Sequence, residues 1–154
     1  MNLLFDTNII LNTVRAVDDS GITYFLNPQN FPVYISVASE GEIRSIALQN
    51  KWGVVKLNRL NDFLEQVSII DINKLSINIF TELDAYSQLR NPDFQTYPFE
   101  TPRNMGKNDL WIASLAALLD LQPVTTDADF DHLHNVFFDV RKIKQHEFLP
   151  FFKK

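Results

Sequence analysis

Short apolar runs recur along the chain and predict strands that are buried on both faces. They cover residues 3–5, 33–35, 68–70, 123–125 and 137–138. Runs of this length, without alternating polar positions, are typical of parallel sheets that helices cover on both sides. The first run stops at Asp6, so a charged residue directly follows a strand that we expect to be buried.

Between these runs, apolar residues at intervals of three or four positions predict helices. One helix follows Asp6 and passes through Val14. Further helices are predicted over residues 36–53, 54–67, 75–89 and 108–121, with a helical turn over residues 128–133. Gly53 is expected to end the helix that begins at residue 36, and Asn108 is expected to cap the helix that it begins.

Two segments carry the signals of loops. Gly21, Pro28 and Pro32 mark a loop before the second strand, and residues 91–106 combine proline, aromatic and polar residues. A long loop inside a compact domain is usually functional or mobile. The alternation of strands and helices predicts an α/β fold, a three-layer α/β/α sandwich with a mostly parallel central sheet. Residues 1–154 are expected to form a single domain.

Composition narrows the class of protein without identifying a function. The chain has 45% hydrophobic and 21% charged residues and no cysteine, which predicts a globular protein and excludes disulfides and thiolate metal sites. Neither a bilayer-spanning run nor a signal-like N-terminus is present, so we expect a cytoplasmic protein without a membrane partner. The net charge of −5 disfavours nucleic acid as a partner, unless a cation neutralises clustered acids. Basic residues gather in groups such as Arg90, Arg103 and Lys107, for which a solvated surface is the simpler interpretation.

Four acidic residues follow predicted strands or lie near the starts of helices: Asp6, Glu42, Asp109 and Asp127. Each of them has a purely structural alternative. Asp6 could cap the next helix, and Asp127 could cap the turn that follows it. Glu42 is expected in the first turn of its helix with capping-box spacing from Ser39, and Asp109 suits the dipole at a helix start.

Taken together, the four positions favour a metal site. In a parallel sheet, the carboxyl ends of the strands lie along one edge, where ligands bind. Four carboxylates at that edge would repel one another and raise their pKa values, and a divalent cation would relieve the repulsion. Oxygen ligands without cysteine favour Mg²⁺ or Mn²⁺ over zinc.

Other catalytic arrangements find little support in the sequence. His132 and His134 have no third ligand of their kind nearby, and we expect both to lie on the surface. The glycines form no phosphate-binding loop, and no serine stands in a nucleophile elbow. An aspartate-nucleophile phosphatase is disfavoured, because Asn8 stands where a second aspartate is needed.

In these acidic motifs the sequence resembles the PIN-domain nucleases, and among them the VapC-like toxins of bacterial toxin–antitoxin pairs. LLFDTNIIL is similar to the first motif of the family, and ISVASEGEIRS to the second, with Glu42 as its glutamate. NDLWIASLAALLDLQPVTTDADF resembles the third and fourth motifs run together. The resemblance extends to about Phe130, although residues 54–106 carry no motif of the family.

The resemblance implies metal-dependent hydrolysis of phosphodiester bonds in RNA. The implied catalytic and metal-binding residues are Asp6, Glu42, Asp109 and Asp127, with Asn8, Thr125 and Asp129 in support. It also implies a homodimer and a small antitoxin that blocks the active site. The alternative is a PIN-like module that binds RNA or a protein without cutting.

Overall fold

The computed structural model of the chain describes residues 1–153 and has a central sheet of five parallel strands. The spatial order of the strands is β3-β2-β1-β4-β5. Their bounds are β1 (Asn2–Phe5), β2 (Val33–Ser36), β3 (Ser68–Ile70), β4 (Leu121–Thr125) and β5 (Arg141–Lys142). The first strand of the chain therefore lies at the centre of the sheet, with β4 as one of its two neighbours.

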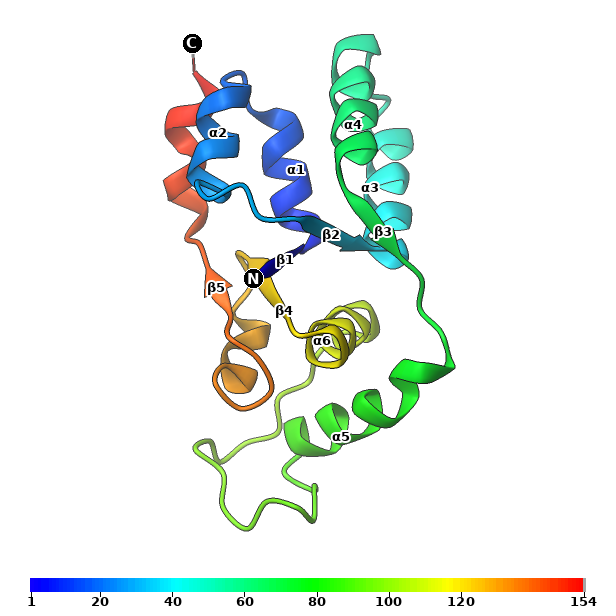
Figure 1. The fold of residues 1–154 in the computed structure, drawn as a ribbon, viewed down its shortest axis with the longest axis vertical. Coiled ribbons are helices and arrows are strands. Elements are labelled where there is room, and N and C mark those ends of the chain that lie inside the picture. The colour runs from blue at the N-terminus through cyan, green and yellow to red at the C-terminus, as the bar shows by residue number, and fades with distance from the viewer. Residues whose placement is uncertain (154) are drawn as a thin grey trace.

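Helices cover both faces of the sheet (Figure 1). One layer contains α1 (Thr7–Arg15), α2 (Asp19–Leu26), α3 (Val37–Gln49), α4 (Val54–Gln66) and the 3₁₀ helix η3 (Gln145–Phe152). The other contains η1 (Lys74–Ser76), α5 (Ile77–Ser87), α6 (Lys107–Leu119) and η2 (Ala128–Leu133). This arrangement confirms the predicted three-layer α/β/α sandwich.

The side chains of β1 explain why a buried strand has no polar alternation. Leu3 and Phe5 pack into the core beneath α1, whereas Leu4 packs into the core beneath α6. Successive side chains of a strand point to opposite faces, so a strand between two helical layers needs apolar residues at every position. Polar groups of such a strand are confined to its ends, where Asp6 lies.

Two predicted boundaries near glycines are wrong. Gly21 lies inside α2, in a segment that we expected to be a loop. The Asp18 carboxylate caps this helix by accepting the Gly21 N–H at 2.9 Å, and a Cβ at Gly21 would collide with that carboxylate. Gly53 does not end α3, which finishes at Gln49, but instead precedes α4 as its N-cap.

The predicted last strand is also wrong. Phe137 and Phe138 pack into the core beneath α6 instead of joining the sheet as a strand. The fifth strand follows at Arg141–Lys142, and the Arg141 guanidinium donates to the Phe25 carbonyl at 2.9 Å. Residues 91–106 contain neither helix nor strand, as predicted. Within residues 1–153, no helix combines the length and the apolarity that crossing a membrane requires.

Candidate active site

Acidic side chains from both layers meet at the carboxyl edge of the sheet. Asp6 directly follows β1, and Asp127 lies two residues beyond the end of β4. Asp109 is in the first turn of α6, as predicted. Glu42 belongs to the second turn of α3 and not to the first, because that helix begins at Val37.

Asp6 is the most deeply buried of these acids, with 5% of its surface exposed. Its Oδ1 accepts the Thr7 N–H at 2.7 Å, so it caps α1, and its Oδ2 accepts the Thr125 hydroxyl at 2.7 Å. Burial raises the pKa of Asp6, and these two hydrogen bonds partly oppose the rise by stabilising the ionised form. The capping role and the place in the acidic cluster therefore belong to the same carboxylate.

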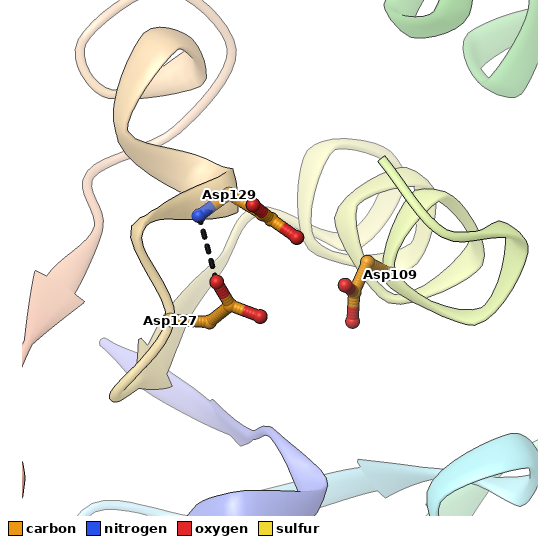
Figure 2. A group of neighbouring side chains, drawn as sticks. All are labelled: Asp109, Asp127 and Asp129. Carbon is orange, nitrogen blue, oxygen red and sulfur yellow. Dashed lines mark hydrogen bonds between the residues drawn. The ribbon is translucent and has the colours of Figure 1, made fainter. Parts of the chain in front are cut away.

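Thr125 connects Asp6 to the acids that follow β4. Its hydroxyl donates to Asp6 and accepts the Asp127 N–H at 3.0 Å. The Asp127 carboxylate in turn accepts the Asp129 N–H at 2.9 Å and caps η2, as expected (Figure 2). This chain of hydrogen bonds fixes the first residues of η2 relative to β1.

Asp109, Asp127 and Asp129 form the tightest group of the site. One carboxylate oxygen from each residue lies within 4.8 Å of the others, and Figure 2 shows Asp109 on α6 opposite Asp127 and Asp129 at the start of η2. Burial and then the charges of the neighbouring acids raise the pKa of Asp109 to about 7. The neighbouring acids that raise it are Asp6, Asp127, Asp129 and Glu42. An oxygen-only group with this repulsion suits Mg²⁺ or Mn²⁺, which take carboxylate ligands.

Glu42 is held by a residue from the opposite helical layer. Its Oε1 accepts the side-chain amide of Asn108 at 3.0 Å. Burial and the charge of Asp6 raise the pKa of Glu42, whereas the Asn108 hydrogen bond lowers it. The expected capping roles are therefore wrong, because Gly106 is the N-cap of α6 and Ser36, not Ser39, caps α3.

Two serines at the start of α3 form contacts that the sequence did not predict. The Ser36 hydroxyl accepts the Ser39 N–H at 3.0 Å, and the Ser39 hydroxyl accepts the Thr7 hydroxyl at 3.1 Å. These contacts join the starts of α1 and α3. A serine directly after an apolar strand was the available signal. Asn8 is exposed on α1, and its supporting role stays a prediction.

The prediction that both histidines lie on the surface is wrong for His132. Only 7% of its surface is exposed, and its Nε2 lies 2.7 Å from the Ser87 hydroxyl. Burial, followed by the charge of Arg103, lowers the pKa of His132 to about 4. His134 is exposed, and its Nδ1 accepts the Val140 N–H at 2.9 Å.

Comparisons with known proteins agree with this architecture. A sequence profile described as the PIN domain matches residues 3–135. A search of curated proteins finds no significant match.

Three solved structures illustrate the likeness in fold. VapBC2 from Rickettsia felis, bound to a DNA fragment from its promoter, is 21% identical with a TM-score of 0.69, covering 92% of this chain and 98% of that one. FitAcB from Neisseria gonorrhoeae is 21% identical with a TM-score of 0.66, covering 92% and 97%. VapBC-5 from Mycobacterium tuberculosis, from the VapBC family of toxin–antitoxin systems, is 17% identical with a TM-score of 0.57, covering 92% and 98%.

Proposed function

The chain belongs to the PIN domain family, and from that premise we propose that it is an endoribonuclease that depends on Mg²⁺ or Mn²⁺. The observation that carries the proposal is the convergence of Asp109, Asp127 and Asp129 within 4.8 Å, beside the buried Asp6. Carboxylates crowded together at the ligand-binding edge of a parallel sheet repel one another, and this arrangement is costly unless it binds a cation.

Each of the acidic residues has a defined part in the proposal. Asp6, Glu42, Asp109 and Asp127 would hold the ion, and Asp129 would support them. When bound there, Mg²⁺ or Mn²⁺ would lower the pKa of an attacking water and offset the charge that develops on the phosphate. Thr125 would keep Asp6 and Asp127 in register through the hydrogen bonds described above, and Asn108 would orient Glu42.

Protonation of Asp109 would regulate the affinity for the cation. With a pKa of about 7, its carboxyl holds a proton in a large fraction of molecules at neutral pH. Binding of a cation would displace that proton, because metal ligands must be deprotonated. No side-chain nucleophile is needed in this scheme.

We also propose that the protein is the cytoplasmic toxin of a toxin–antitoxin pair and acts as a homodimer. The support is the likeness in fold to VapBC-5, which belongs to a family of toxin–antitoxin systems. Co-purification with the product of an adjacent short gene, and loss of RNA cleavage in that complex, would be the expected result. A purified monomer that cleaves RNA with unchanged activity beside that product would contradict this part.

The test of the enzymatic proposal is cleavage of single-stranded RNA with Mg²⁺ or Mn²⁺ present. Asp109→Asn should reduce the rate at least about 100-fold, since it removes a ligand and not just a supporting group. Asp62→Asn is the matched control, because Asp62 is exposed on α4, in the layer opposite α6. Full activity in both Asp6→Asn and Asp109→Asn would refute the mechanism. Cation binding by calorimetry without cleavage of any RNA would instead identify a binding module.

A further inference from the structure

The loop of residues 91–106 is firmly attached next to the acidic cluster. Tyr86 on α5 packs against Phe94 and Phe99, with ring centroids 4.6 and 5.5 Å apart. The Tyr97 hydroxyl accepts the Asn91 N–H at 2.9 Å and donates to the Asn91 carbonyl at 2.9 Å. An anchored loop of this kind can present a side chain at a fixed place, which a mobile loop cannot.

Arg103 is the one basic residue of this loop. Its backbone N–H donates to the Ser87 carbonyl at 2.7 Å, and its guanidinium lies over the Phe99 ring at 5.8 Å. Phe99 contacts the His132 ring edge to face at 5.4 Å, and His132 belongs to η2, the helix that carries Asp129. The charge of Arg103 also lowers the pKa of Asp129, against the effect of burial.

The guanidinium of Arg103 does not form an ion pair with an acidic residue among residues 1–153. Among residues 1–153, the side chains of arginine and lysine that form ion pairs with carboxylates are those of Arg44 and Lys142. Arg103 is exposed, and its guanidinium lies over the Phe99 ring without an ion-pair partner among the described residues. An open arginine fork matches the oxygens of a phosphate.

We propose that Arg103 binds a backbone phosphate of the RNA strand next to the phosphate that is cut, so that the loop 91–106 sets the path of the strand across the acids. The proposal rests on the ribonuclease function proposed above. A protein with a net charge of −5 and a cluster of carboxylates repels a polyanion. A fixed cation at the rim of the cluster offsets this repulsion where the strand enters. As a cation, Arg103 cannot itself ligate a metal, which separates its role from that of the acids.

The chain offers a matched control in Arg90. This arginine is also exposed, and its backbone N–H is also fixed to α5, by donating to the Ala85 carbonyl at 2.8 Å. Arg90 contributes to the shifted pKa of neither Asp109 nor Asp129, whereas Arg103 lowers that of Asp129. Replacing either arginine with alanine makes the same change in net charge, so a difference between the two variants reports a local contact.

The experiment measures binding of a fluorescein-labelled single-stranded RNA of mixed sequence by anisotropy over a range of KCl concentrations. Asp109→Asn serves as the background that prevents cleavage, with Mg²⁺ present throughout. Adding Arg103→Ala should weaken binding about 10-fold and reduce the slope of log K against log salt by about 0.7, the value for one phosphate contact on a single strand. Arg103→Lys should retain most of the slope, and Arg90→Ala should change affinity less than about 2-fold.

A second measurement uses the protein with an intact acidic cluster. Arg103→Ala should raise KM for RNA cleavage and leave kcat nearly unchanged, because the contact is present in the bound ground state as well. Far-ultraviolet circular dichroism should be unaltered, since the backbone hydrogen bond of residue 103 does not depend on its side chain.

The outcomes distinguish this inference from the proposed function. Equal salt slopes and equal KM values for Arg103→Ala and Arg90→Ala, in a protein that cleaves RNA, would overturn the role of Arg103 alone. A difference in slope without any cleavage by the unaltered protein would support the phosphate contact and refute the nuclease. RNA that does not bind at all would refute both.

Discussion

Replacing Asp109 with asparagine should stabilise the protein when no divalent cation is present. In the folded chain, burial of this carboxylate and then the charges of the surrounding acids raise its pKa from 3.8 to about 7. Asparagine has nearly the same shape and carries no charge. The substitution therefore removes the repulsion without opening a cavity. The same change is expected to abolish cleavage, so stability and function should move in opposite directions.

The magnitude follows from the pKa of Asp109. Because that pKa is higher in the folded chain than in the unfolded chain, the favourable contribution of the protonated form is complete below pH 3.8 and is lost as the pH rises towards 7. The full pKa shift corresponds to about 4 kcal/mol in the free energy of unfolding. Since the side chain is only partly buried, solvent screens the repulsion, and we expect about half of this, about 2 kcal/mol, at pH 7.5. In a domain of this size the melting temperature should rise by about 4–8 °C.

The assay is urea unfolding of the unaltered protein and of Asp109→Asn in EDTA, at several pH values between 3.5 and 8. The difference in the free energy of unfolding should grow from near zero at the acid end to its maximum above pH 7. Adding Mg²⁺ should stabilise the unaltered protein more than the variant, because a ligand stabilises the state that binds it. Asp62→Asn controls for the change in net charge.

A variant that is less stable than the unaltered protein in EDTA at pH 7.5 would refute the reasoning. It would mean that Asp109 makes favourable contacts that exceed the repulsion. A stabilisation of the same size at every pH would refute it as well, because the repulsion exists only when the carboxyl is ionised.

Two further predictions concern the groups around the cluster. Thr125→Val should lower the free energy of unfolding by about 1–3 kcal/mol at pH 7.5 and slow RNA cleavage about 10–100-fold, because buried Asp6 loses a hydrogen-bond donor. Thr125→Ser keeps the hydroxyl and should restore both the stability, measured by urea titration, and the rate of RNA cleavage. The folded protein disfavours protonated His132, whose pKa is lowered from 6.5 to about 4, so this residue's contribution to stability should be lost as the pH falls below 6.5. Between pH 7.5 and 5 the free energy of unfolding should fall by about 2 kcal/mol on account of His132, and His132→Gln should lack this fall in paired urea titrations. The same pH dependence of stability in the variant and the unaltered protein would contradict the prediction.

The features that the sequence predicted correctly depend on local patterns combined with a general rule of sheet geometry. Apolar runs without polar alternation correctly predicted the first four strands in chain order, because a strand between two helical layers needs such a run. Parallel strands end at one edge of their sheet, and this rule accounts for the convergence of Asp6 and Asp127, whereas the place of Asp109 also required the predicted helix start. Capping by Asp6 and Asp127 also follows from the adjacent sequence.

The features that escaped prediction depend on contacts between distant parts of the chain. Glu42 is held by Asn108, 66 positions away in the other helical layer, and no periodicity connects the two. His132 resembles a surface residue in sequence, yet it is buried beside Ser87 and the rings of the loop. Phe137 was assigned to a strand because a short apolar run looks the same in sequence whether it joins a sheet or fills an aromatic cluster. In the structure Phe137 packs against Tyr86 in such a cluster.

The central position of β1 determines when the site can form during synthesis. Asp6 leaves the ribosome before its partner Thr125, which lies 119 positions later in the chain, and β1 lacks one of its two neighbours until β4 emerges. Proteins are made from the N-terminus, and a contact over so long a separation forms late. A nascent chain that has not yet reached β4 therefore carries the motif DTN without the Asp6–Thr125 contact, and a prematurely terminated product that ends there cannot assemble the candidate site.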